Sequence, residues 1–240
     1  MSTHKTQLRW REEVAEGTMA FQLAKPPGFV HQPGQSILLT LLNPPQTDDA
    51  GNSRTFTIAS SPHEPELMIA TRLRDSAFKR VLRDLPIGAG LTLTGPEGEM
   101  TLDENDQRPA VLLAGGIGIT PFLAMARHAL EVDLERHIHL FYASRRPEEA
   151  AYLDELSEMT TVNPYFHLIP VMSAPTGSAR AWRGETGHID GAMLARYLPD
   201  LLAPVYYFAG PPAMTTAMDA MLAGIGVAES DRHYETFYGY

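Results

Sequence analysis

Residues 111–121, VLLAGGIGITP, form an apolar run followed by a glycine-rich turn and a proline. The run is typical of a buried strand, and Pro121 suits the first turn of a following helix, where its missing N–H needs no partner. Thr120 is the natural N-cap of that helix. Three glycines let the backbone approach a ligand without Cβ collisions, namely Gly115, Gly116 and Gly118. This arrangement is typical of a pyrophosphate-binding backbone, although the spacing is not GxGxxG and a tight turn that binds nothing remains an alternative.

The chain from residue 106 to residue 240 alternates strands with helices. Buried strands are predicted at 110–114, 137–142, 165–171, 204–209 and 232–237. Helices are predicted between them at 121–132, 147–160, 190–198 and 211–224. Such alternation predicts a doubly wound parallel sheet, here of five strands, and sheets of this kind bind ligands at the carboxyl ends of their strands.

Residues 1–105 differ, because their apolar stretches are short, roughly alternating and bounded by proline and glycine. Strands are predicted at 18–23, 36–42, 55–59, 66–72 and 91–94. One helix is predicted at 76–85, with Asp75 or Ser76 as its N-cap. This pattern predicts a small antiparallel barrel. The chain is therefore expected to form two domains, residues 1–105 and residues 106–240.

The composition excludes several classes of protein. The 240 residues include no cysteine, which excludes disulfides, thiolate zinc sites and cysteine-ligated iron–sulfur clusters. A net charge of -10 disfavours nucleic acid or an anionic membrane as the main partner. No apolar run approaches the roughly 20 residues of a membrane span. Because the N-terminal residues contain no apolar signal core, a cytoplasmic location is expected.

Nine histidines raise the question of a metal site. His137 and His139 open a predicted strand two residues apart, which places both side chains on one face. No third ligand has a suggestive spacing. We therefore expect ordinary strand-end residues and predict no metal site.

Residues 54–57, RTFT, offer a cation, an aromatic face and a hydroxyl from one short predicted strand. Arg54 can pair with a diphosphate in fork geometry while Phe56 packs on a flat ring. The Thr57 hydroxyl can then hydrogen-bond a ring nitrogen. Alone, a strand arginine is more often solvated. About sixty residues ahead of the glycine turn, however, the motif suggests a flavin held face to face with a nicotinamide.

Two further features bear on nucleotide binding. Gly210 and Pro211 end another predicted strand, where a glycine lets a flat ring pass the strand end. Met214, in the helix that follows, is predicted equally as a core residue and as a site residue. A cluster of basic residues lies between residues 72 and 83. Three roles remain open for it: to neutralise a cofactor phosphate, to dock an acidic partner, or only to keep one face of a helix solvated.

Together these motifs resemble the ferredoxin–NADP reductase superfamily of flavoproteins over nearly the whole chain. Residues 54–57 are similar to its Arg-x-Tyr-Ser/Thr flavin motif, the glycine turn to its nicotinamide-dinucleotide motif, and residues 207–214 to its last nucleotide-domain motif. Residues 72–79, 95–98 and 235–237 resemble a second flavin segment, the turn closing the flavin domain and a terminal Glu-x-aromatic motif. The resemblance implies a six-stranded antiparallel flavin-binding barrel followed by a doubly wound five-stranded parallel sheet for the nicotinamide dinucleotide.

The resemblance also implies roles for individual residues. Arg54 is expected at the FAD pyrophosphate, Phe56 stacked on the isoalloxazine and Thr57 at its N5. The expected flavin-binding residues are Arg54, Phe56, Thr57, Ile69, Ala70, Thr71, Ser76, Phe78 and Lys79. The expected dinucleotide-binding residues are Gly115, Gly116, Gly118, Thr120, Ser144, Arg145, Gly210, Pro211 and Met214. Catalytic roles are expected for Thr57, for Glu235 through a proton or a charge, and for Phe237 as a cover of the flavin ring.

The implied activity is that of an FAD-dependent oxidoreductase that passes hydride from NADH or NADPH to flavin N5 and electrons onward to an acceptor. The expected acceptor is ferredoxin, flavodoxin, an oxygenase component or a small molecule. Ala174 stands where NADP-specific members tend to have arginine, which leaves the nicotinamide preference open. A non-catalytic redox-sensing subunit and a flavin-free nucleotide-binding scaffold remain alternatives.

Overall fold

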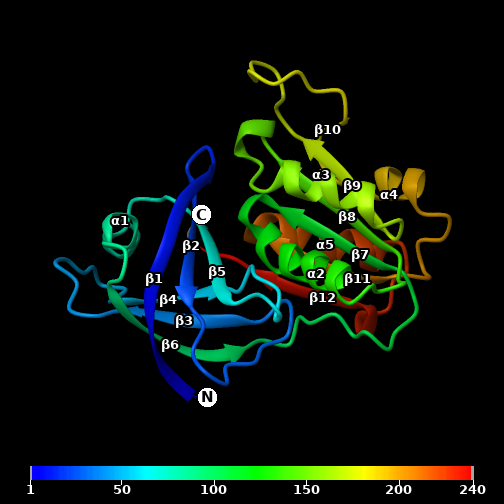
Figure 1. Cartoon of the computed structure of the whole chain (residues 1–240). Coiled ribbons are helices and arrows are strands. Elements are labelled where there is room, and N and C mark those ends of the chain that lie inside the picture. Colours follow the sequence, from blue (N-terminus) through cyan, green and yellow to red (C-terminus); the bar gives the residue numbers. More distant parts are fainter. Residues whose placement is uncertain (1, 239–240) are drawn as a thin grey trace.

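The computed structural model describes residues 2–238 and contains two sheets that lie side by side (Figure 1). The first sheet is antiparallel, with the strand order β4-β3-β6-β1-β2-β5. Its strands are β1 (Ser2–Ala15), β2 (Thr18–Ala24), β3 (Ser36–Leu41), β4 (Ser53–Thr57), β5 (Glu66–Arg72) and β6 (Gly90–Glu97). The end strands β4 and β5 lie against each other, and just beyond β4 the Ala59 N–H donates to the Met68 carbonyl, which closes the sheet into a barrel.

Strand β1 has no counterpart among the strands that we predicted from apolar stretches. It pairs with β6 through its first half and with β2 through its second half, so its backbone holds the middle of the barrel together. Only Thr6 and Leu8 on this strand are buried, and most of its other side chains are polar. The strand is therefore specified by its two partners, because its own sequence carries little apolar alternation.

The predicted helix of the barrel domain is confirmed as α1 (Ala77–Asp84). Ser76, rather than Asp75, caps it, since the Ser76 hydroxyl accepts a hydrogen bond from the Lys79 N–H at 3.3 Å. Phe78, Val81 and Leu82 bury one face of α1 against the barrel core. This packing fixes the first turn of α1 beside the end of β4.

The second sheet is wholly parallel, with the order β10-β9-β8-β7-β11-β12. Its strands are β7 (Ala110–Gly115), β8 (Ile138–Ser144), β9 (Phe166–Met172), β10 (Glu185–Thr186), β11 (Val205–Gly210) and β12 (Arg232–Thr236). We predicted five strands, and the structure has six. The additional strand β10 consists of two residues, which is too short to show the apolar–polar alternation by which strands are predicted. The predicted domain boundary at residue 105 falls between β6 and β7 and stays a prediction.

Helices cover both faces of the parallel sheet, as predicted. The helices α2 (Ile119–Glu131) and α3 (Leu153–Val162) pack on the face that also meets barrel residues, and α4 (Gly191–Tyr197) and α5 (Pro212–Gly224) pack on the other face. Over residues 2–238, no helix has the length and apolar content needed to cross a membrane.

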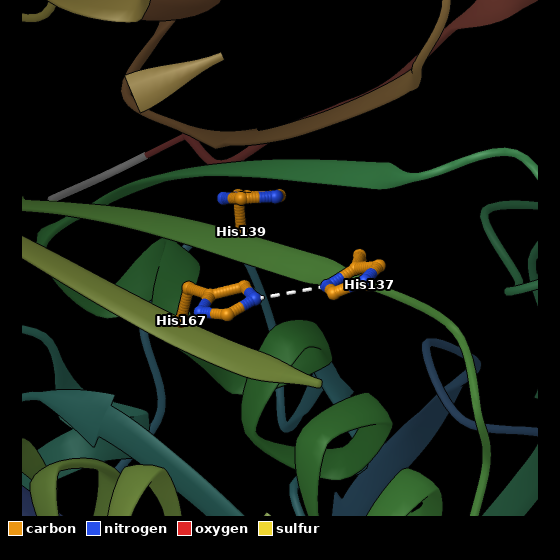
Figure 2. Close-up of side chains that lie close together, drawn as sticks. All are labelled: His137, His139 and His167. Carbon is orange, nitrogen blue, oxygen red and sulfur yellow. Dashed lines mark hydrogen bonds between the residues drawn. The ribbon is translucent and has the colours of Figure 1, made fainter. Parts of the chain in front are cut away.

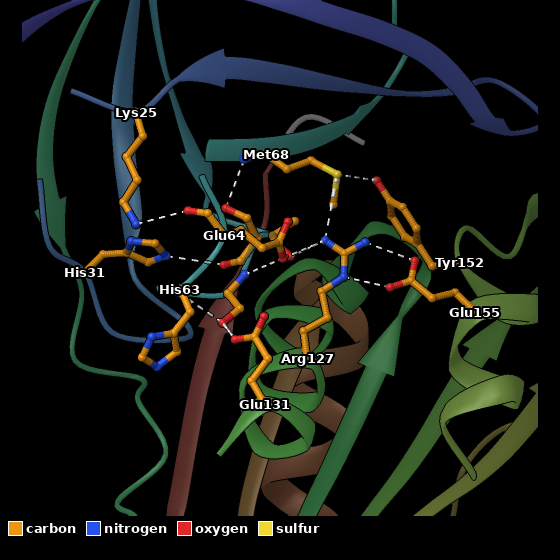
Figure 3. A network of polar contacts seen from close by, with 12 residues as sticks. Lys25, His31, His63, Glu64, Met68, Arg127, Glu131, Tyr152 and Glu155 are labelled. Atoms are coloured by element: carbon orange, nitrogen blue, oxygen red, sulfur yellow. Dashed lines mark hydrogen bonds and ion pairs between the residues drawn. The ribbon is translucent and has the colours of Figure 1, made fainter. Parts of the chain in front are cut away.

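Arg127 of α2 joins the helices on the parallel sheet to the barrel (Figure 3). Its guanidinium donates to Glu155 of α3 at 2.7 Å, to Glu64 of the barrel at 3.3 Å and to the Ala59 carbonyl at 3.3 Å. Because the Arg127 side chain is only 17% exposed, these charge-assisted bonds are little screened by solvent. They help to fix how the first turn of α2 faces the end of β4.

Candidate functional site

Two adjoining cavities lie between the domains. The barrel-side cavity, of about 280 Å³, is lined by Arg54, Phe56, Thr57, Ala70, Thr120 and Glu235, among others. The sheet-side cavity, of about 270 Å³, is lined by Gly115, Gly116, Ser144, Arg145, Pro211 and Met214, among others. Ile117 and Phe237 line both cavities. The structure thus brings most of the predicted residues to two neighbouring spaces that share a wall.

Arg54 is held in place by protein groups at the edge of the barrel-side cavity. Its guanidinium donates to the Asp48 carboxylate at 2.9 Å and to the carbonyl oxygens of Ala50, Gly51 and Ser53. The same guanidinium lies 5.3 Å from the centre of the Phe78 ring. Arg54 is thus pre-oriented by a folded loop, which reduces the entropy lost when it binds an anion.

Asp48 joins Arg54 to the first turn of α1. Its second carboxylate oxygen accepts a hydrogen bond from the Ala77 N–H at 2.9 Å. This bond is the main cause of a lowered Asp48 pKa, and Arg54 adds to it. A carboxylate therefore occupies the position between an arginine and a helix start where the resemblance places a diphosphate. Asp48 was not predicted, because it lies in a loop whose sequence carries no motif.

Ser76, Phe78 and Lys79 surround this anion position. The Ser76 hydroxyl is engaged as the cap of α1, and Phe78 is buried in the barrel core. Burial lowers the pKa of Lys79 to about 8, and repulsion from Arg74 and Arg54 lowers it further in the same direction. The three predicted residues thus lie together in and beside the first turn of α1, whose Ala77 N–H donates to Asp48.

Phe56 and Thr57 form the wall of the barrel-side cavity at the end of β4. The Phe56 ring is only 4% exposed and packs on Phe78 with their centres 5.8 Å apart. The buried Thr57 hydroxyl donates to a carboxylate oxygen of Glu235 at 3.5 Å. Among the other predicted flavin residues, Ala70 lines this cavity, whereas Ile69 and Thr71 are fully buried neighbours on β5.

Glu235 brings an ionisable group from β12 into the barrel-side cavity. Burial raises its pKa to about 7, and the nearby charge of Glu97 raises it too, while the Thr57 hydrogen bond acts in the opposite direction. A carboxyl group with this pKa exchanges a proton near neutral pH. The catalytic role of Glu235 stays a prediction.

We expect Glu235→Gln to remove a pH dependence from the stability of the flavin-free protein. Because the pKa of Glu235 is raised from 4.5 to about 7 on folding, the folded state holds this proton more tightly than the unfolded chain. The contribution to stability is therefore complete below pH 4.5 and is lost as the pH rises through 7, by at most about 3 kcal/mol. Urea denaturation at about pH 5 and about pH 8 measures the loss. Glu97→Gln is the control and should keep most of it, whereas identical profiles for wild type and Glu235→Gln would contradict the assignment.

The glycine turn forms the floor of the sheet-side cavity. Gly116 has a φ of +55°, a conformation that favours glycine. A Cβ on Gly115 would lie 2.1 Å from Sδ of Met214, and a Cβ on Gly118 would lie 2.1 Å from the Ala209 carbonyl oxygen. The turn therefore requires glycine for two different reasons. At Gly115 a side chain would collide with Met214 beside the cavity, and at Gly118 it would collide with the backbone of β11.

Thr120 is not the N-cap of α2, so that prediction was wrong. A single 3-10 turn, η1 (Gly116–Gly118), precedes α2, which begins at Ile119 with Gly118 in the cap position. The Thr120 hydroxyl donates to the Ile117 carbonyl at 3.1 Å from inside the helix. Thr120 lines the barrel-side cavity, on the other side of the turn from Gly115.

Met214 lines the sheet-side cavity, which favours the site role over the core role that we left open. Its sulfur lies over Gly115 and Gly210, so the small size of both glycines makes room for it. Met218, four residues later in α5, is buried in the core. Met214 and Met218 lie on one face of α5, with Met214 at the cavity end of that face and Met218 deeper in the core.

Six residues that line the sheet-side cavity were not among the predicted site residues, namely Arg72, Arg74, Ile117, Ala143, Ser173 and His188. Arg72 is the last residue of β5 and Arg74 follows that strand, and with Arg145 they give this cavity a cationic rim. Arg72 also contacts Glu149 at 3.3 Å. The basic cluster in the sequence was the available signal for the arginines, whereas His188 lies in a loop with no recognisable pattern.

Comparison with known proteins agrees with this geometry. Residues 112–220 match the family model described as the oxidoreductase NAD-binding domain. The chain is 28% identical to the glycine betaine monooxygenase reductase subunit of Chromohalobacter salexigens, over 92% of this chain and 60% of that protein. It is 36% identical to a flavohemoprotein of a Burkholderia species, over 78% of this chain and 44% of that protein. It thus spans less than two thirds of the length of these curated relatives.

Solved structures share the fold. The FAD/NAD-binding domain of nitric oxide dioxygenase from Vibrio cholerae superposes with a TM-score of 0.82 at 18% identity, covering 97% of this chain and 98% of that chain. The two sheets of this chain therefore have the fold of that FAD/NAD-binding domain. Residues 112–220 therefore carry an oxidoreductase NAD-binding domain, and the fold of the whole chain is shared with a ferredoxin NADP+ reductase from Neisseria gonorrhoeae, with a TM-score of 0.82 at 17% identity over 98% of each chain.

Proposed function

We propose that this chain passes hydride from NADH or NADPH to FAD and then passes electrons to an oxygenase component or another redox acceptor. The observation that carries the proposal is the pair of cavities, one built on the barrel and one on the parallel sheet, which meet at Ile117 and Phe237. Two ligands that fill these spaces have their ends next to each other. Hydride transfer needs such contact between the two rings.

The barrel-side residues fit the diphosphate of FAD. Arg54 and the Ala77 N–H already donate hydrogen bonds to an anionic group, the Asp48 carboxylate. A diphosphate offers the same type of acceptor with more negative charge. Binding of FAD in this mode requires Asp48 to leave its position, so Asp48 competes with the cofactor for the same donors.

The sheet-side residues fit a dinucleotide. Gly115 and Gly116 leave the floor of the cavity without side chains, and a Cβ at Gly115 would meet Met214. The cationic rim formed by Arg72, Arg74 and Arg145 favours phosphate groups. Arg146 and Arg180 are engaged with Glu149 and Asp154, which makes Arg145 our candidate for the adenosine end.

FAD, when bound, supplies the hydride and electron chemistry. The protein's own residues bind the two cofactors, orient their rings and exclude water. Thr57 would orient the ring nitrogen, and Glu235 would hold or release a proton beside Thr57 at neutral pH. Phe237 lies in the wall between the cavities, so it keeps water from the flavin ring and must move aside for the nicotinamide.

The proposed acceptor is a separate redox centre. Similarity to a monooxygenase reductase subunit supports an oxygenase component as that partner. The 240 residues contain no cysteine with which to ligate an iron–sulfur cluster. Ferredoxin, flavodoxin or a small molecule is the alternative acceptor that we propose. We also propose a cytoplasmic location.

An anaerobic titration tests the proposal. Protein reconstituted with FAD is mixed with NADH and, separately, with NADPH while the visible absorbance of the flavin is followed. We expect at least one nucleotide to bleach the flavin at close to one equivalent, and the more effective one defines the preference. Free FAD at the same concentration is the control. A flavin-loaded protein that neither nucleotide bleaches would instead support the redox-sensing subunit.

A further inference from the structure

Three histidines gather at the end of the parallel sheet that is remote from both cavities (Figure 2). His139 of β8 and His167 of β9 are paired directly in the strand register. His137 lies two residues before His139, so its side chain points to the same face of the sheet. The cavities lie at the other end of these strands, next to Ser144 and Ser173. Nothing in the proposed reaction uses the three histidines.

The spacing of the ring nitrogens suits a shared metal ion. Nδ1 of His137 lies 3.0 Å from Nε2 of His167, and one ring nitrogen of each histidine lies within 4.8 Å of the others. Two nitrogens that bind one tetrahedral zinc ion are roughly 3.3 Å apart, given metal–nitrogen distances of about 2.0–2.1 Å. The pair formed by His137 and His167 already has this spacing. The His139 ring is stacked on the His167 ring with their centres 4.6 Å apart, and its nitrogen is the third ligand within reach.

The surroundings of His139 and His167 favour the neutral imidazole, the form that binds metal. Burial lowers the pKa of His139 to about 4, and the neighbouring His167 and His137 act in the same direction. Burial and His137 also lower the pKa of His167. The ring of Tyr165 packs edge-on against His137. His137 itself is exposed, so one side of the cluster is open to an entering ion and to water.

We propose that His137, His139 and His167 bind one divalent transition-metal ion of the zinc class. Three imidazoles and no carboxylate select Zn²⁺, Co²⁺, Ni²⁺ or Cu²⁺ and reject Ca²⁺ and Mg²⁺, which need oxygen ligands. Water occupies the fourth position on the exposed side. The ion ties β8 to β9 and stabilises the folded sheet, because the unfolded chain does not hold the ligands together.

Isothermal calorimetry tests this site with tag-free, chelator-treated protein and Zn²⁺ alone, with Mg²⁺ as the comparison ion. We expect one Zn²⁺ per chain, a rise in melting temperature with Zn²⁺ and not with Mg²⁺, and binding weakened at least about tenfold in His167→Gln. His63→Gln is the matched control, because His63, His128 and Glu131 form the other possible ligand group within residues 2–238. That variant should bind Zn²⁺ as the wild type does.

A second variant and a spectroscopic readout guard against a folding defect. His137→Gln removes an exposed ligand and should fold normally while losing the same affinity. Electron paramagnetic resonance of the Cu²⁺ form should show coupling to several nitrogens, with fewer in this variant. Zn²⁺ binding that survives in both His167→Gln and His137→Gln, binding that is lost in His63→Gln, or no binding by the wild type would each overturn the proposal.

Discussion

Arg54→Ala should yield a folded protein that is purified largely without FAD. Arg54 offers a planar pair of donors beside the first turn of α1, and no other side chain at the barrel-side cavity offers that fork. Losing two charge-assisted hydrogen bonds to a diphosphate costs about 3 kcal/mol, or about 100-fold in affinity. The flavin-to-protein ratio after purification and the Kd from quenching of flavin fluorescence measure the effect.

Two further variants separate the charge of Arg54 from its geometry and from its role in the loop. Arg54→Lys keeps the charge without the fork and should lie between wild type and Arg54→Ala. Asp48→Asn should act in the opposite direction and tighten FAD binding, because it weakens the group that competes for Arg54 and the Ala77 N–H. Circular dichroism of each variant checks that changing the loop from Asp48 to Ser53 has left the barrel folded. Full flavin content in Arg54→Ala would refute the assignment.

The architecture could be predicted from the sequence wherever a segment carries its own pattern. Residues 110–114 are continuously apolar because β7 is buried on both faces of a parallel sheet. The cap and apolar spacing of residues 76–85 likewise mark α1. Strand β1 shows no such pattern, because its position depends on β6 and β2. The two residues of β10 owe their strand conformation to β9 alone.

The site could be predicted to the extent that it consists of motifs. Arg54, Gly115 and Gly210 belong to segments with recognisable spacing, and all three lie at the cavities or their edges. Asp48 and His188 come from loops, and only the folded chain brings them to the site. The raised pKa of Glu235 arises from burial between the domains, which no local pattern encodes. The third histidine of the cluster, His167, was missed because its neighbours His137 and His139 lie on a different strand.

Gly118→Ala should destabilise the protein by roughly 3 kcal/mol or more. The backbone at Gly118, with φ of −59° and ψ of −2°, is one that alanine adopts freely, so conformational strain is not the cause. The cause is contact, since the new Cβ would lie 2.1 Å from the Ala209 oxygen and 2.5 Å from its carbonyl carbon. Ala209 cannot retreat, because β11 is paired with β7 on one side and β12 on the other. Urea denaturation measures the loss as a lower midpoint.

Gly115→Ala is the matched variant, because it adds the same methyl group three residues before Gly118 and away from the contact with Ala209. Its Cβ would meet Sδ of Met214, a flexible side chain that can rotate away into the sheet-side cavity. Stability should therefore fall by less than about 1 kcal/mol, while nucleotide affinity falls because the cavity is partly filled. Combining Gly115→Ala with Met214→Ala restores the space and should recover nucleotide binding. If Gly118→Ala were instead as stable as Gly115→Ala, the turn would not be packed against β11, and its glycines would serve only the ligand.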